Sequence, residues 1–367
     1  MLAPTFVQHA TPMKPTSNIT LKRIADELGI SMTTVSRALS GQARKYRVGR
    51  QTEERVRELA ASLGFSPNRL ARGLRLKRSS TIGLVIPDVS NPFFAGIVRQ
   101  VTLGARERRY SVIVCDSQDS EEIEIESLTL LRSHGVEGIV LCPVGLSAAH
   151  LACFEQGDLP LVLADRYFPG LRLPYVASDN YGGAKEATNH LIHNGHRCIA
   201  CIQGLRGASP NEDRLRGYKD ALAAARIPLD ERLVAGDSFG EQSGYVTTKL
   251  LLKSAGGFTA IFALSNLISL GALRALAEEG VRVPDDVSLI SFDDQPYSAH
   301  LASPMTVVSQ SSAEMGQIAC KLLFDRIRSP SQAVRGGILL PTTLIPRASV
   351  RNLNQLRTER TQRHVRG

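Results

Sequence analysis

Arg37 belongs to a short set of side chains whose types and spacing suit the recognition of a nucleic acid. In the segment TLKRIADELGISMTTVSRAL, residues 20–39, helical spacing places Met32, Thr33, Ser36 and Arg37 on one solvent-facing side. An arginine can bond O6 and N7 of guanine at the same time, and the major groove of a DNA duplex admits one helix. The segment therefore predicts a DNA-reading surface with Arg37 as its main base-reading residue.

Two short helices joined by a sharp turn must position this surface. Apolar residues recur at helical spacing at Leu21, Ile24, Ala25 and Leu28. Gly29 can take the left-handed conformation that ends a helix, and Ser31 is a favourable N-cap for the next one. Val35 and Leu39 would then pack against the first helix, which is helix-turn-helix geometry. Because this motif is short, an ordinary helical corner with a solvated arginine is the alternative interpretation.

A basic loop and a third helix follow. The loop GQARKYRVGRQ, residues 41–51, carries arginines and a lysine that we expect to face phosphates. The third helix is expected to begin near Thr52, because Glu53 and Glu54 suit a first turn, and to end at Gly64. Its apolar residues recur at Val56, Leu59, Ala60 and Leu63. Since three short helices make a small core, DNA or a partner subunit is expected to contribute to its stability.

The segment FSPNRLARGLRLKRSS, residues 65–80, predicts both a domain boundary and a second DNA-binding element. Ser66 can cap a helix and Pro67 fits its first turn, so a short helix is encoded as far as about Leu74. A helix of two turns is unstable by itself. Insertion of Leu74 into the minor groove, together with phosphate contacts, would order it. The alternative is a solvated linker.

The basic charge of the chain is concentrated near its N-terminus. The chain has 367 residues, which is enough length for two or three domains, and its formal charge is +9. Residues 1–79 hold 15 Lys and Arg against 5 Asp and Glu, whereas residues 80–346 hold 23 against 29. A basic segment attached to an acidic body is typical of a nucleic-acid-binding module joined to another domain.

The sequence contains no apolar stretch of the kind that secretion or membrane insertion requires. The first nineteen residues lack an apolar core, and no run of eighteen apolar residues occurs. We therefore expect a soluble, cytoplasmic protein with reduced cysteines. Cys198 and Cys201 have the spacing of half a metal site, but on a strand their sulfur atoms would point to opposite faces. Neither a metal ion nor a cofactor is predicted.

From residue 80 onward, apolar strands alternate with helices. Strands are expected at 81–87, 111–115, 138–141, 161–165, 198–202, 260–264 and 287–292, and helices from Asn91 and at 121–133, 180–194, 214–225 and 267–279. Strands of this composition are typical of parallel sheets with helices on both faces. Because they are too many for one ordinary sheet, we expect an α/β body of two doubly wound lobes, with a ligand beyond the carboxyl ends of the strands.

Seven segments, taken in order, resemble the lactose-repressor and galactose-repressor family of bacterial transcription regulators. They are TLKRIADELGISMTTVSRALSG, SPNRLARGLR, IGLVIPDVSNPFF, HLIHNGHRCIACI, NEDRLRGY, LGALRALAEEGVRVPDDVSLISFDD and SPMTVVSQ, and the resemblance covers roughly residues 19–350. It implies a homodimer whose paired helix-turn-helix headpieces bind double-stranded DNA at a pseudo-palindromic operator. It also implies a body like a periplasmic binding protein, which binds a small effector.

The resemblance implies roles for particular residues in DNA binding. Met32, Thr33 and Arg37 match the family's main base-reading positions, and Leu74 matches the leucine that enters the minor groove. The further DNA-binding residues that it implies are Thr20, Thr34, Ser36, Asn68, Arg69 and Ala71. Met32 stands where tyrosine or alanine is common, so the operator sequence does not follow from the resemblance.

The resemblance also implies an effector pocket in the body. The residues assigned to it are Phe93, Phe94, Asp116, Arg166, Arg214, Phe239, Ser265 and Asp293. Charged groups bond sugar hydroxyls well and aromatic rings cover the apolar faces of a pyranose, so a sugar or sugar derivative is expected. Ala208 stands where a purine-binding relative has an arginine, which argues against a purine. The structural alternatives are a core role for Phe93, an ion pair for Arg214 and a cap for Asp293.

These observations predict a ligand-responsive DNA-binding regulator and five segments. They are a disordered N-terminal extension (1–18), a headpiece (19–65), a hinge helix with linker (66–79), a two-lobed effector-binding and dimerisation domain (80–346), and a last strand with a basic tail (347–367). The alternatives are a cytoplasmic sugar-binding protein and an enzyme. The sequence carries no phosphate-binding loop, nucleophile elbow or zinc-protease motif, which disfavours the enzyme.

Overall fold

A computed structural model describes residues 20–65, 78–155, 157–254, 257–329 and 336–355. The chain divides into two compact units, residues 1–79 and 80–367. The predicted extension 1–18, residues 66–77 of the predicted hinge and residues 356–367 of the predicted tail lie outside the described residues. The residues outside the described part include four predicted DNA-binding residues, Asn68, Arg69, Ala71 and Leu74.

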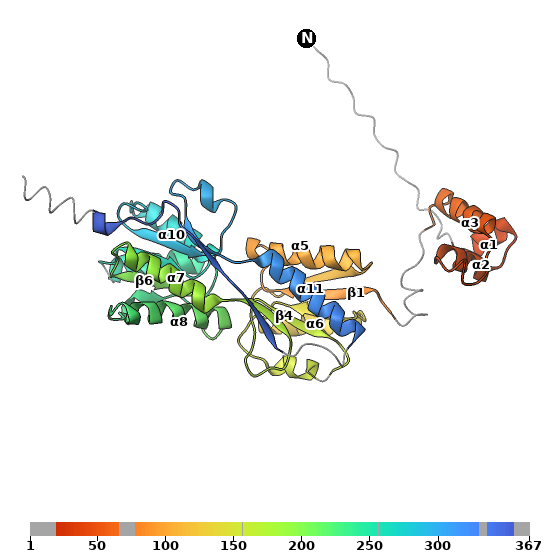
Figure 1. Ribbon diagram of the computed structural model, residues 1–367, viewed down its shortest axis with the longest axis horizontal. Helices are drawn as coiled ribbons and strands as arrows, with labels where there is room; N and C mark the ends of the chain where they lie inside the picture. Colours follow the sequence, from red (N-terminus) through yellow and green to blue (C-terminus); the bar gives the residue numbers. More distant parts are fainter. Residues whose placement is uncertain (1–19, 66–77, 156, 255–256, 330–335, 356–367) are drawn as a thin grey trace, which may run out of the picture. The chain divides into compact units, whose positions relative to one another are not determined.

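The described part of the first unit is formed by three helices (Figure 1). They are α1 (Leu21–Leu28), α2 (Met32–Leu39) and α3 (Arg50–Ser62). Gly29 ends α1 in the left-handed conformation at φ 64°, and the Ser31 hydroxyl caps α2 by accepting a hydrogen bond from the Thr34 amide at 3.1 Å. Both features agree with the sequence-based prediction of a sharp turn between the two helices.

The core of this unit differs slightly from the prediction. Ile24, Val35 and Val56, one from each helix, are fully buried at its centre. Ala38 is also fully buried, whereas Leu39 is only partly buried, so α2 turns the side that bears Val35 and Ala38 inward. Because alanine is small, α2 can approach its neighbours closely at this position. The start of α3 at Arg50 is two residues earlier than predicted.

The second unit, or body, contains two six-stranded sheets. The first has the order β11-β5-β4-β3-β1-β2 and consists of β1 (Thr81–Ile86), β2 (Ser111–Asp116), β3 (Ile139–Leu141), β4 (Leu161–Ala164), β5 (Tyr175–Ser178) and β11 (Gly337–Leu340). The second has the order β12-β10-β9-β8-β6-β7 and consists of β6 (Ile199–Ile202), β7 (Val234–Ala235), β8 (Ala260–Ala263), β9 (Ser288–Phe292), β10 (Thr306–Ser309) and β12 (Thr343–Ile345). Neighbouring strands are parallel except β12, which is antiparallel to β10.

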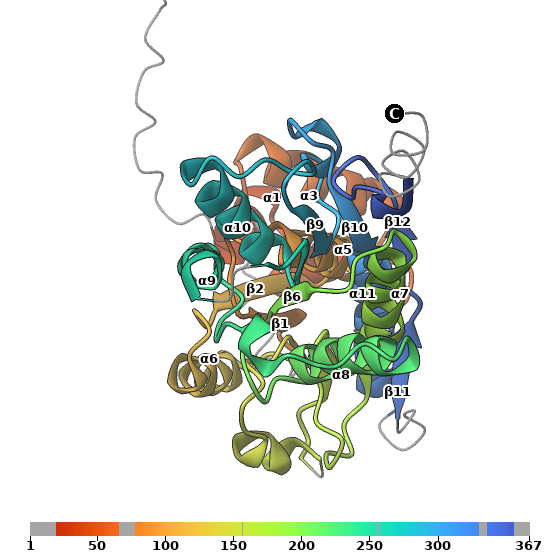
Figure 2. The same ribbon diagram turned by 90° about the vertical axis from the view of Figure 1, so that its left-hand side faces the viewer.

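Helices cover both faces of each sheet, as predicted for doubly wound lobes. They are α5 (Pro92–Glu107), α6 (Glu121–Ser133), α7 (Asn180–His193), α8 (Ser209–Ala224), α9 (Glu241–Ser254), α10 (Asn266–Glu278) and α11 (Ser312–Arg328). In the first lobe, α5 and α11 pack on one face and α6 on the other. Figure 2 shows α7 and α8 on one side of β6, and α9 and α10 on the other.

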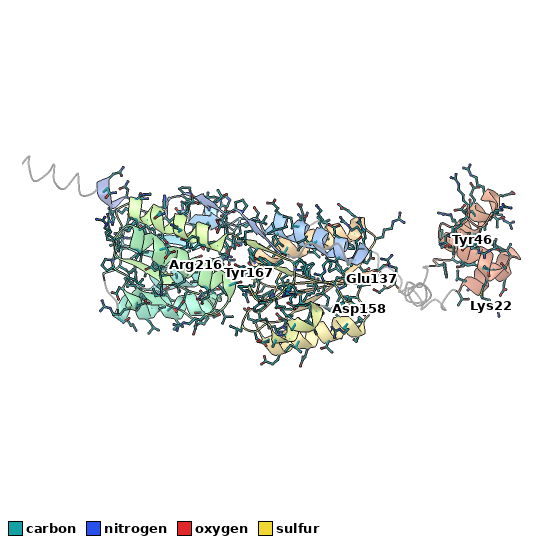
Figure 3. The ribbon with its side chains drawn as sticks, turned by 60° about the horizontal axis from the view of Figure 1, so that its bottom comes forward. Lys22, Tyr46, Glu137, Asp158, Tyr167 and Arg216 are labelled. Atoms are coloured by element: carbon teal, nitrogen blue, oxygen red, sulfur yellow. The ribbon has the colours of Figure 1, made fainter. Side chains whose placement is uncertain are left out.

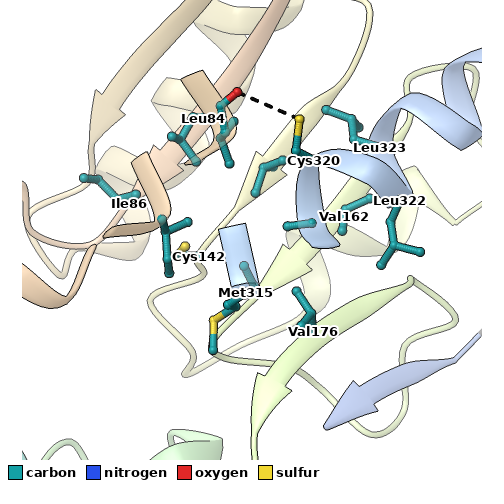
Figure 4. Close-up of a cluster of buried hydrophobic side chains, with 14 of the residues drawn as sticks. Leu84, Ile86, Cys142, Val162, Val176, Met315, Cys320, Leu322 and Leu323 are labelled. Atoms are coloured by element: carbon teal, nitrogen blue, oxygen red, sulfur yellow. Dashed lines mark hydrogen bonds between the residues drawn. The ribbon is translucent and has the colours of Figure 1, made fainter. Parts of the chain in front are cut away.

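The core under α11 shows how these layers are held together. Met315, Leu322 and Leu323 of α11 pack toward Val162 of β4 and Val176 of β5 (Figure 4). Because apolar side chains fill both faces of the parallel strands, the strands have no free face for a ligand. A ligand site is therefore confined to the ends of the strands.

Within the described residues of the body, the chain passes between the two lobes three times, near Asp179, Gln310 and Thr342. The Asp179 amide donates to the carbonyl of Leu340 at 2.7 Å, and the Thr342 hydroxyl donates to the carbonyl of Asp179 at 3.4 Å. The first and third crossings therefore lie against each other. Adjacent crossings of this kind act as a hinge about which two lobes can open and close.

Two element boundaries differ from the prediction. Helix α8 begins at Ser209, five residues before the predicted start at 214, because Pro210 fits its first turn. The last strand, β12, ends at Ile345, so the predicted strand is absent from residues 347–355. Ser349 instead accepts a hydrogen bond from the Thr306 amide at 2.8 Å through its hydroxyl, which fastens this segment to β10.

Two further predictions concern the placement of Cys198 and Cys201 and the presence of membrane-spanning helices. Cys201 is buried in the core beneath α7 and α8, whereas Cys198 packs toward the core on the other face of the same sheet. The two sulfur atoms therefore lie on opposite faces, as predicted. Among the described residues, no helix has the length and apolar character that a bilayer crossing needs.

Candidate functional site

A cavity lies between the two lobes at the carboxyl ends of β4 and β9. It is lined by Asn91, Phe93, Phe94, Asp165, Arg166, Pro210, Arg214, Phe239, Ser265, Asp293 and Gln310. Its volume is about 30 Å³, far below the roughly 300–1,000 Å³ of an ordinary small-molecule pocket. The lobes must therefore separate before a larger ligand can enter.

Seven of the eight residues that the sequence assigned to a pocket line this cavity, and Asp116 does not. Asp116 is the last residue of β2, which is the edge strand of the first sheet, and its carboxylate accepts a hydrogen bond from the Gln118 amide at 3.3 Å. Strand β4, by contrast, lies inside the sheet and ends at the cavity. The position of β2 in the sheet explains why Asp116 lies apart from the other seven residues.

Two buried aspartates, Asp165 and Asp293, directly follow β4 and β9. Both have left-handed backbone conformations, with φ of 67° and 74°, which residues other than glycine seldom adopt. Burial raises the pKa of both carboxyl groups, to about 6 for Asp165, while Arg214 acts to lower it. Strained backbone and destabilised carboxylates concentrate at functional sites, so this pair is a candidate for ligand binding.

The partners of the two carboxylates differ. Asp293 accepts hydrogen bonds from the Gln310 side-chain amide and from the backbone amide of Asn266. Asp165 Oδ1 is buried and has no partner in the described part of the chain, and its Oδ2 lies 3.9 Å from Arg166 Nε. Asp165 therefore keeps one oxygen atom available for a donor that is not part of the protein.

Arg214 belongs to α8 of the second lobe and is buried, with 3% of its surface exposed. Its Nε donates to Asn180 Oδ1 at 2.8 Å and its Nη1 to the carbonyl of Leu264 at 2.6 Å, while its guanidinium lies 3.7 Å from the centroid of the Phe292 ring. Burial lowers its pKa, and the carboxylates of Asp293 and Asp165 oppose this effect. Within the described residues Nη2 has no hydrogen-bond partner, so this nitrogen is available to a ligand.

Arg166 holds the first lobe's side of the cavity. Its Nη1 donates to the carbonyls of Val144 and Pro143 and lies 3.4 Å from Asp119 Oδ1. Its guanidinium carbon lies 5.2 Å from the centroid of the Phe239 ring, which belongs to the second lobe. The Nε atom is buried and lacks a hydrogen-bond partner among the described residues, although it lies 3.9 Å from Asp165 Oδ2. Arg166 thus contacts both lobes and retains one donor for a ligand.

Asn91 and Asn266 join the lobes beside the cavity. Asn91 caps α5 by accepting from the Phe93 amide, and it also accepts from the side-chain amide of Asn266 at 3.1 Å. The Asn266 Oδ1 atom and the Gln310 Oε1 atom are buried without partners in the described part of the chain. Buried polar atoms of this kind are uncommon in proteins and call for a ligand or water.

The aromatic residues and Ser265 have different roles. The rings of Phe93 and Phe94 are packed edge to face at 5.1 Å between centroids, and both are buried. Ser265 caps α10 by accepting from the Ile268 amide, and its hydroxyl donates to the carbonyl of Phe239 at 3.1 Å. The Ser265 hydroxyl is therefore engaged within the protein, and it orients the loop that carries Phe239.

The sequence-based prediction missed Asn91, Asp165, Pro210 and Gln310. Asp165 follows an apolar strand just as Asp293 does, and this signal was present in the sequence. Asn91 and Gln310 reach the cavity because the lobes pack together, and no local pattern predicts that. Ala208, which the resemblance used to argue against a purine, is fully buried and does not line the cavity.

On the first unit, the predicted DNA-reading residues share one side of α2. Met32 is 53% exposed and Thr33 is exposed, whereas Thr34, Ser36 and Arg37 are half-buried. Thr20 caps α1 by accepting from the Arg23 amide at 3.3 Å. The Arg37 guanidinium is not simply solvated, because it lies 4.1 Å from the centroid of the Tyr46 ring.

The two units match two known protein families. Residues 20–68 match the family described as bacterial regulatory proteins, lacI family, and residues 188–350 match the periplasmic binding protein-like domain. The ribose operon repressor of Halalkalibacterium halodurans is 33% identical over 333 residues, which cover 90% of this chain and 97% of that protein.

Solved structures agree. The structure of the transcriptional regulator CelR–cellobiose complex is 34% identical and covers 90% of this chain and 99% of that chain, with a TM-score of 0.68. The lac repressor dimer bound to operator and the anti-inducer ONPF is 26% identical and covers 91% and 100%, with a TM-score of 0.81. Since the similarity runs through headpiece and body alike, an enzyme or a stand-alone sugar-binding protein does not fit. The chain belongs to the LacI family of bacterial regulatory proteins, as a ligand-responsive transcription regulator that binds DNA.

Proposed function

We propose that the cavity between the lobes binds a neutral sugar, and that this sugar controls binding of the headpieces to a pseudo-palindromic operator. The observation that carries the proposal is a set of three buried atoms from residues that line the cavity, which lack hydrogen-bond partners among the described residues: Asp165 Oδ1, Arg166 Nε and Gln310 Oε1. Buried polar atoms without partners cost free energy. Sugar hydroxyls both donate and accept, so one ligand can satisfy the two oxygens and the nitrogen.

The charges around the cavity favour a neutral sugar over a sugar phosphate. The guanidinium groups of Arg166 and Arg214 stand beside the carboxylates of Asp165 and Asp293, so the positive charge is largely balanced. A phosphate group carries a charge of about −1.5 to −2 and would be repelled by both carboxylates. Phe93 and Phe239 supply the apolar surface that the faces of a sugar ring require.

The relatives support this ligand class. One is named for the ribose operon, and a second has been solved with cellobiose. We therefore propose a pentose, a hexose or a disaccharide as the effector. The residues that we assign to its binding are Phe93, Phe94, Asp165, Arg166, Arg214, Phe239, Asp293 and Gln310, with Ser265 holding the loop beside them.

We assign base reading to Met32, Thr33 and Arg37, which lie on one side of α2. Two headpieces are needed to read a pseudo-palindrome, so we propose a homodimer. The body offers an apolar surface for it, since Leu103 of α5, Val114 of β2, and Ile125 and Leu130 of α6 are between 40% and 48% exposed. A regulator that acts on chromosomal operators works in the cytoplasm, and we propose that location.

The experiment combines ligand and DNA binding. Thermal unfolding of the full chain would be measured with a panel of pentoses, hexoses and disaccharides that includes D-ribose and cellobiose. Each sugar would be paired with its phosphorylated form. An operator would be selected from a random duplex library and titrated with and without each sugar that raises the melting temperature. We expect a neutral sugar to change operator affinity about 5- to 150-fold.

Two results would argue against the proposal. A stronger shift with the phosphorylated member of each pair would reject the neutral ligand, because the carboxylates should repel it. A sugar that raises the melting temperature and leaves operator affinity unchanged would reject the linkage between cavity and headpiece.

A further inference from the structure

Tyr46 contacts the proposed base-reading residue from outside the helix-turn-helix. The guanidinium carbon of Arg37 lies 4.1 Å from the centroid of the Tyr46 ring, which is a close cation–π contact. Tyr46 belongs to the loop between α2 and α3 and is labelled on the first unit in Figure 3. Its side chain is 42% exposed, so the ring supports Arg37 at the surface rather than inside the core.

The loop that carries Tyr46 is itself built on Arg37. The carbonyl of Arg37 accepts hydrogen bonds from the Gln42 amide at 3.1 Å and from the Ser40 hydroxyl at 3.3 Å. The Tyr46 amide donates to the carbonyl of Gln42 at 3.2 Å. The loop therefore contacts Arg37 twice, through hydrogen bonds to its backbone carbonyl and through the Tyr46 ring at its guanidinium.

A small apolar anchor fixes the loop to the core. Ala43 is 2% exposed, and its carbonyl accepts a hydrogen bond from the Val48 amide at 2.9 Å. Arg47 has a left-handed φ of 54°, which turns the chain back toward α3. Because the loop has its own hydrogen bonds and a buried residue, it can hold the Tyr46 ring in one place.

We propose that Tyr46 is a positioning residue for operator recognition, whose ring orders the Arg37 guanidinium before DNA is bound. This inference rests on the proposed base-reading role of Arg37. A free arginine side chain has many rotamers, and ordering them on binding lowers affinity. A ring that already holds the guanidinium removes part of that cost while leaving its edge free to bond a base.

Tyr46 could instead contact DNA itself through its hydroxyl, and the choice of variants separates the two roles. Tyr46→Phe keeps the ring and removes the hydroxyl, so positioning predicts near-normal binding and direct contact predicts a loss. Tyr46→Ala removes both groups. Lys45→Ala is the matched control, because Lys45 belongs to the same exposed basic loop and its ammonium is 5.8 Å from the Tyr46 ring centroid.

The test is a double-mutant cycle on the full chain with an operator selected from a random duplex library. Affinity would be measured for the selected duplex and for duplexes changed at each base pair, with wild type, Arg37→Ala, Tyr46→Ala, Tyr46→Phe and Arg37→Ala/Tyr46→Ala. Tyr46→Ala should lower operator affinity about 2- to 5-fold per half-site, or about 4- to 25-fold for two half-sites. This loss should fall on the base pair that Arg37→Ala stops discriminating.

Three outcomes complete the test. The double variant should bind as Arg37→Ala does, because Tyr46 acts through Arg37; additive losses would overturn the proposal. Tyr46→Phe as weak as Tyr46→Ala would also overturn it. Lys45→Ala should weaken all duplexes alike and reduce the salt dependence, as a phosphate contact does. Thermal unfolding of each variant would show whether the fold is intact.

The cycle also separates this inference from the function on which it rests. If Arg37→Ala leaves base discrimination unchanged, both the base-reading role of Arg37 and the positioning role of Tyr46 are wrong. If Arg37→Ala removes discrimination at one base pair and Tyr46→Ala changes nothing there, the proposed function stands and the positioning role of Tyr46 is wrong.

Discussion

Asp165 and Asp293 occupy equivalent places in the two lobes but differ in their surroundings. The strand orders β5-β4-β3-β1-β2 and β10-β9-β8-β6-β7 follow the same pattern, so β4 corresponds to β9. Each aspartate immediately follows its strand, and its backbone amide donates to a carbonyl of the neighbouring strand. Asp165 donates to the carbonyl of Val176 at 2.9 Å, and Asp293 to that of Val308 at 2.8 Å. The sheets thus place both aspartates in the same way.

What differs is the residue that leaves the neighbouring strand. Gln310 follows β10 and donates to Asp293, whereas Asp179 follows β5 at the corresponding place. A carboxylate has no proton to donate, and that of Asp179 caps α7 by accepting from the Gly182 amide at 2.8 Å. Asp165 therefore lacks the partner that Asp293 has. One lobe thus holds its carboxylate in a complete hydrogen-bond network, while the other leaves an oxygen atom for the ligand.

Removing the better-bonded carboxylate should have the largest effect on stability. Asp293→Ala would leave the Gln310 amide and the Asn266 amide without their acceptor and would remove a carboxylate beside buried Arg214. We expect the free energy of unfolding to fall by about 3–5 kcal/mol, measured by urea denaturation at pH 7. Asp293→Asn, which keeps an acceptor oxygen, should cost less. A loss below about 1 kcal/mol for the alanine variant would show that the Asp293 network contributes little.

Removing the charge of Asp165, the carboxylate with fewer hydrogen bonds, should raise stability rather than lower it. Burial raises the pKa of Asp165 from 3.8 to about 6, so the folded chain holds this proton more tightly than the unfolded chain does. Ionisation of Asp165 therefore lowers the stability of the wild type as the pH rises from about 4 to about 6, and this contribution persists above that range. Asp165→Asn avoids this loss and should be more stable by up to about 3 kcal/mol at pH 7.

Urea denaturation of the wild type and Asp165→Asn between pH 4 and pH 7.5 checks this expectation. The difference should be near zero at the acid end and level off above about pH 6. An asparagine variant that is less stable than the wild type at pH 7 would mean that Asp165 is already satisfied within the protein.

A smaller effect is expected where the segment after Asp165 reaches the other lobe. Tyr167 is labelled in Figure 3; its hydroxyl donates to Asp213 of α8 at 3.2 Å, and its ring stacks on that of Tyr175 with 4.3 Å between the centroids. Tyr167→Phe keeps the stacking and removes a hydrogen bond between the lobes, which is worth about 0.5–1.5 kcal/mol. The ligand-free variant should therefore open more readily, with a larger radius of gyration by small-angle scattering. An unchanged radius, with the melting temperature also unchanged, would mean that this bond does not hold the lobes together.

The smallest effect is expected at Asp116, a third aspartate at the end of a strand. Its carboxylate does not line the cavity, because β2 is the edge strand. For Asp116→Ala we expect a sugar affinity within about 2-fold of the wild type and a change in stability within about 0.5 kcal/mol. Calorimetry with the sugar identified by the melting screen would measure the affinity. A tenfold loss would place Asp116 in the binding site and weaken the comparison of the other two aspartates.

Much of the fold could be predicted because buried parallel strands have a distinctive composition. The segment LVLA in β4 is apolar throughout, and SLISF in β9 is buried throughout and apolar except for its two serines. Strand β5, with the sequence YVAS, and helix α9, which contains a glycine and two threonines, lack so clear a pattern and were not predicted. Both depend on packing against neighbours for their stability rather than on local preference.

The site was predicted less completely than the fold. Arg214 and Asp293 came from the resemblance to a family, while Asp165 could have been found by comparing the ends of β4 and β9. Gln310 lies in a crossing between lobes, so its contact with Asp293 depends on tertiary structure. Tyr46 and Arg37 are nine residues apart across an irregular loop, and no periodic pattern predicts that their side chains meet.

The central claim is that a sugar held at Asp165, Arg214 and Asp293 controls operator binding from a distance. It is tested most directly by operator titrations of the wild type and Asp293→Asn, each with and without the sugar that raises the wild type's melting temperature. We expect the sugar to change the operator affinity of the wild type about 5- to 150-fold. Asp293→Asn should match the wild type's affinity without sugar, because Asp293 belongs to the body, and should not respond to the sugar. A variant that responds as the wild type does would contradict the claim.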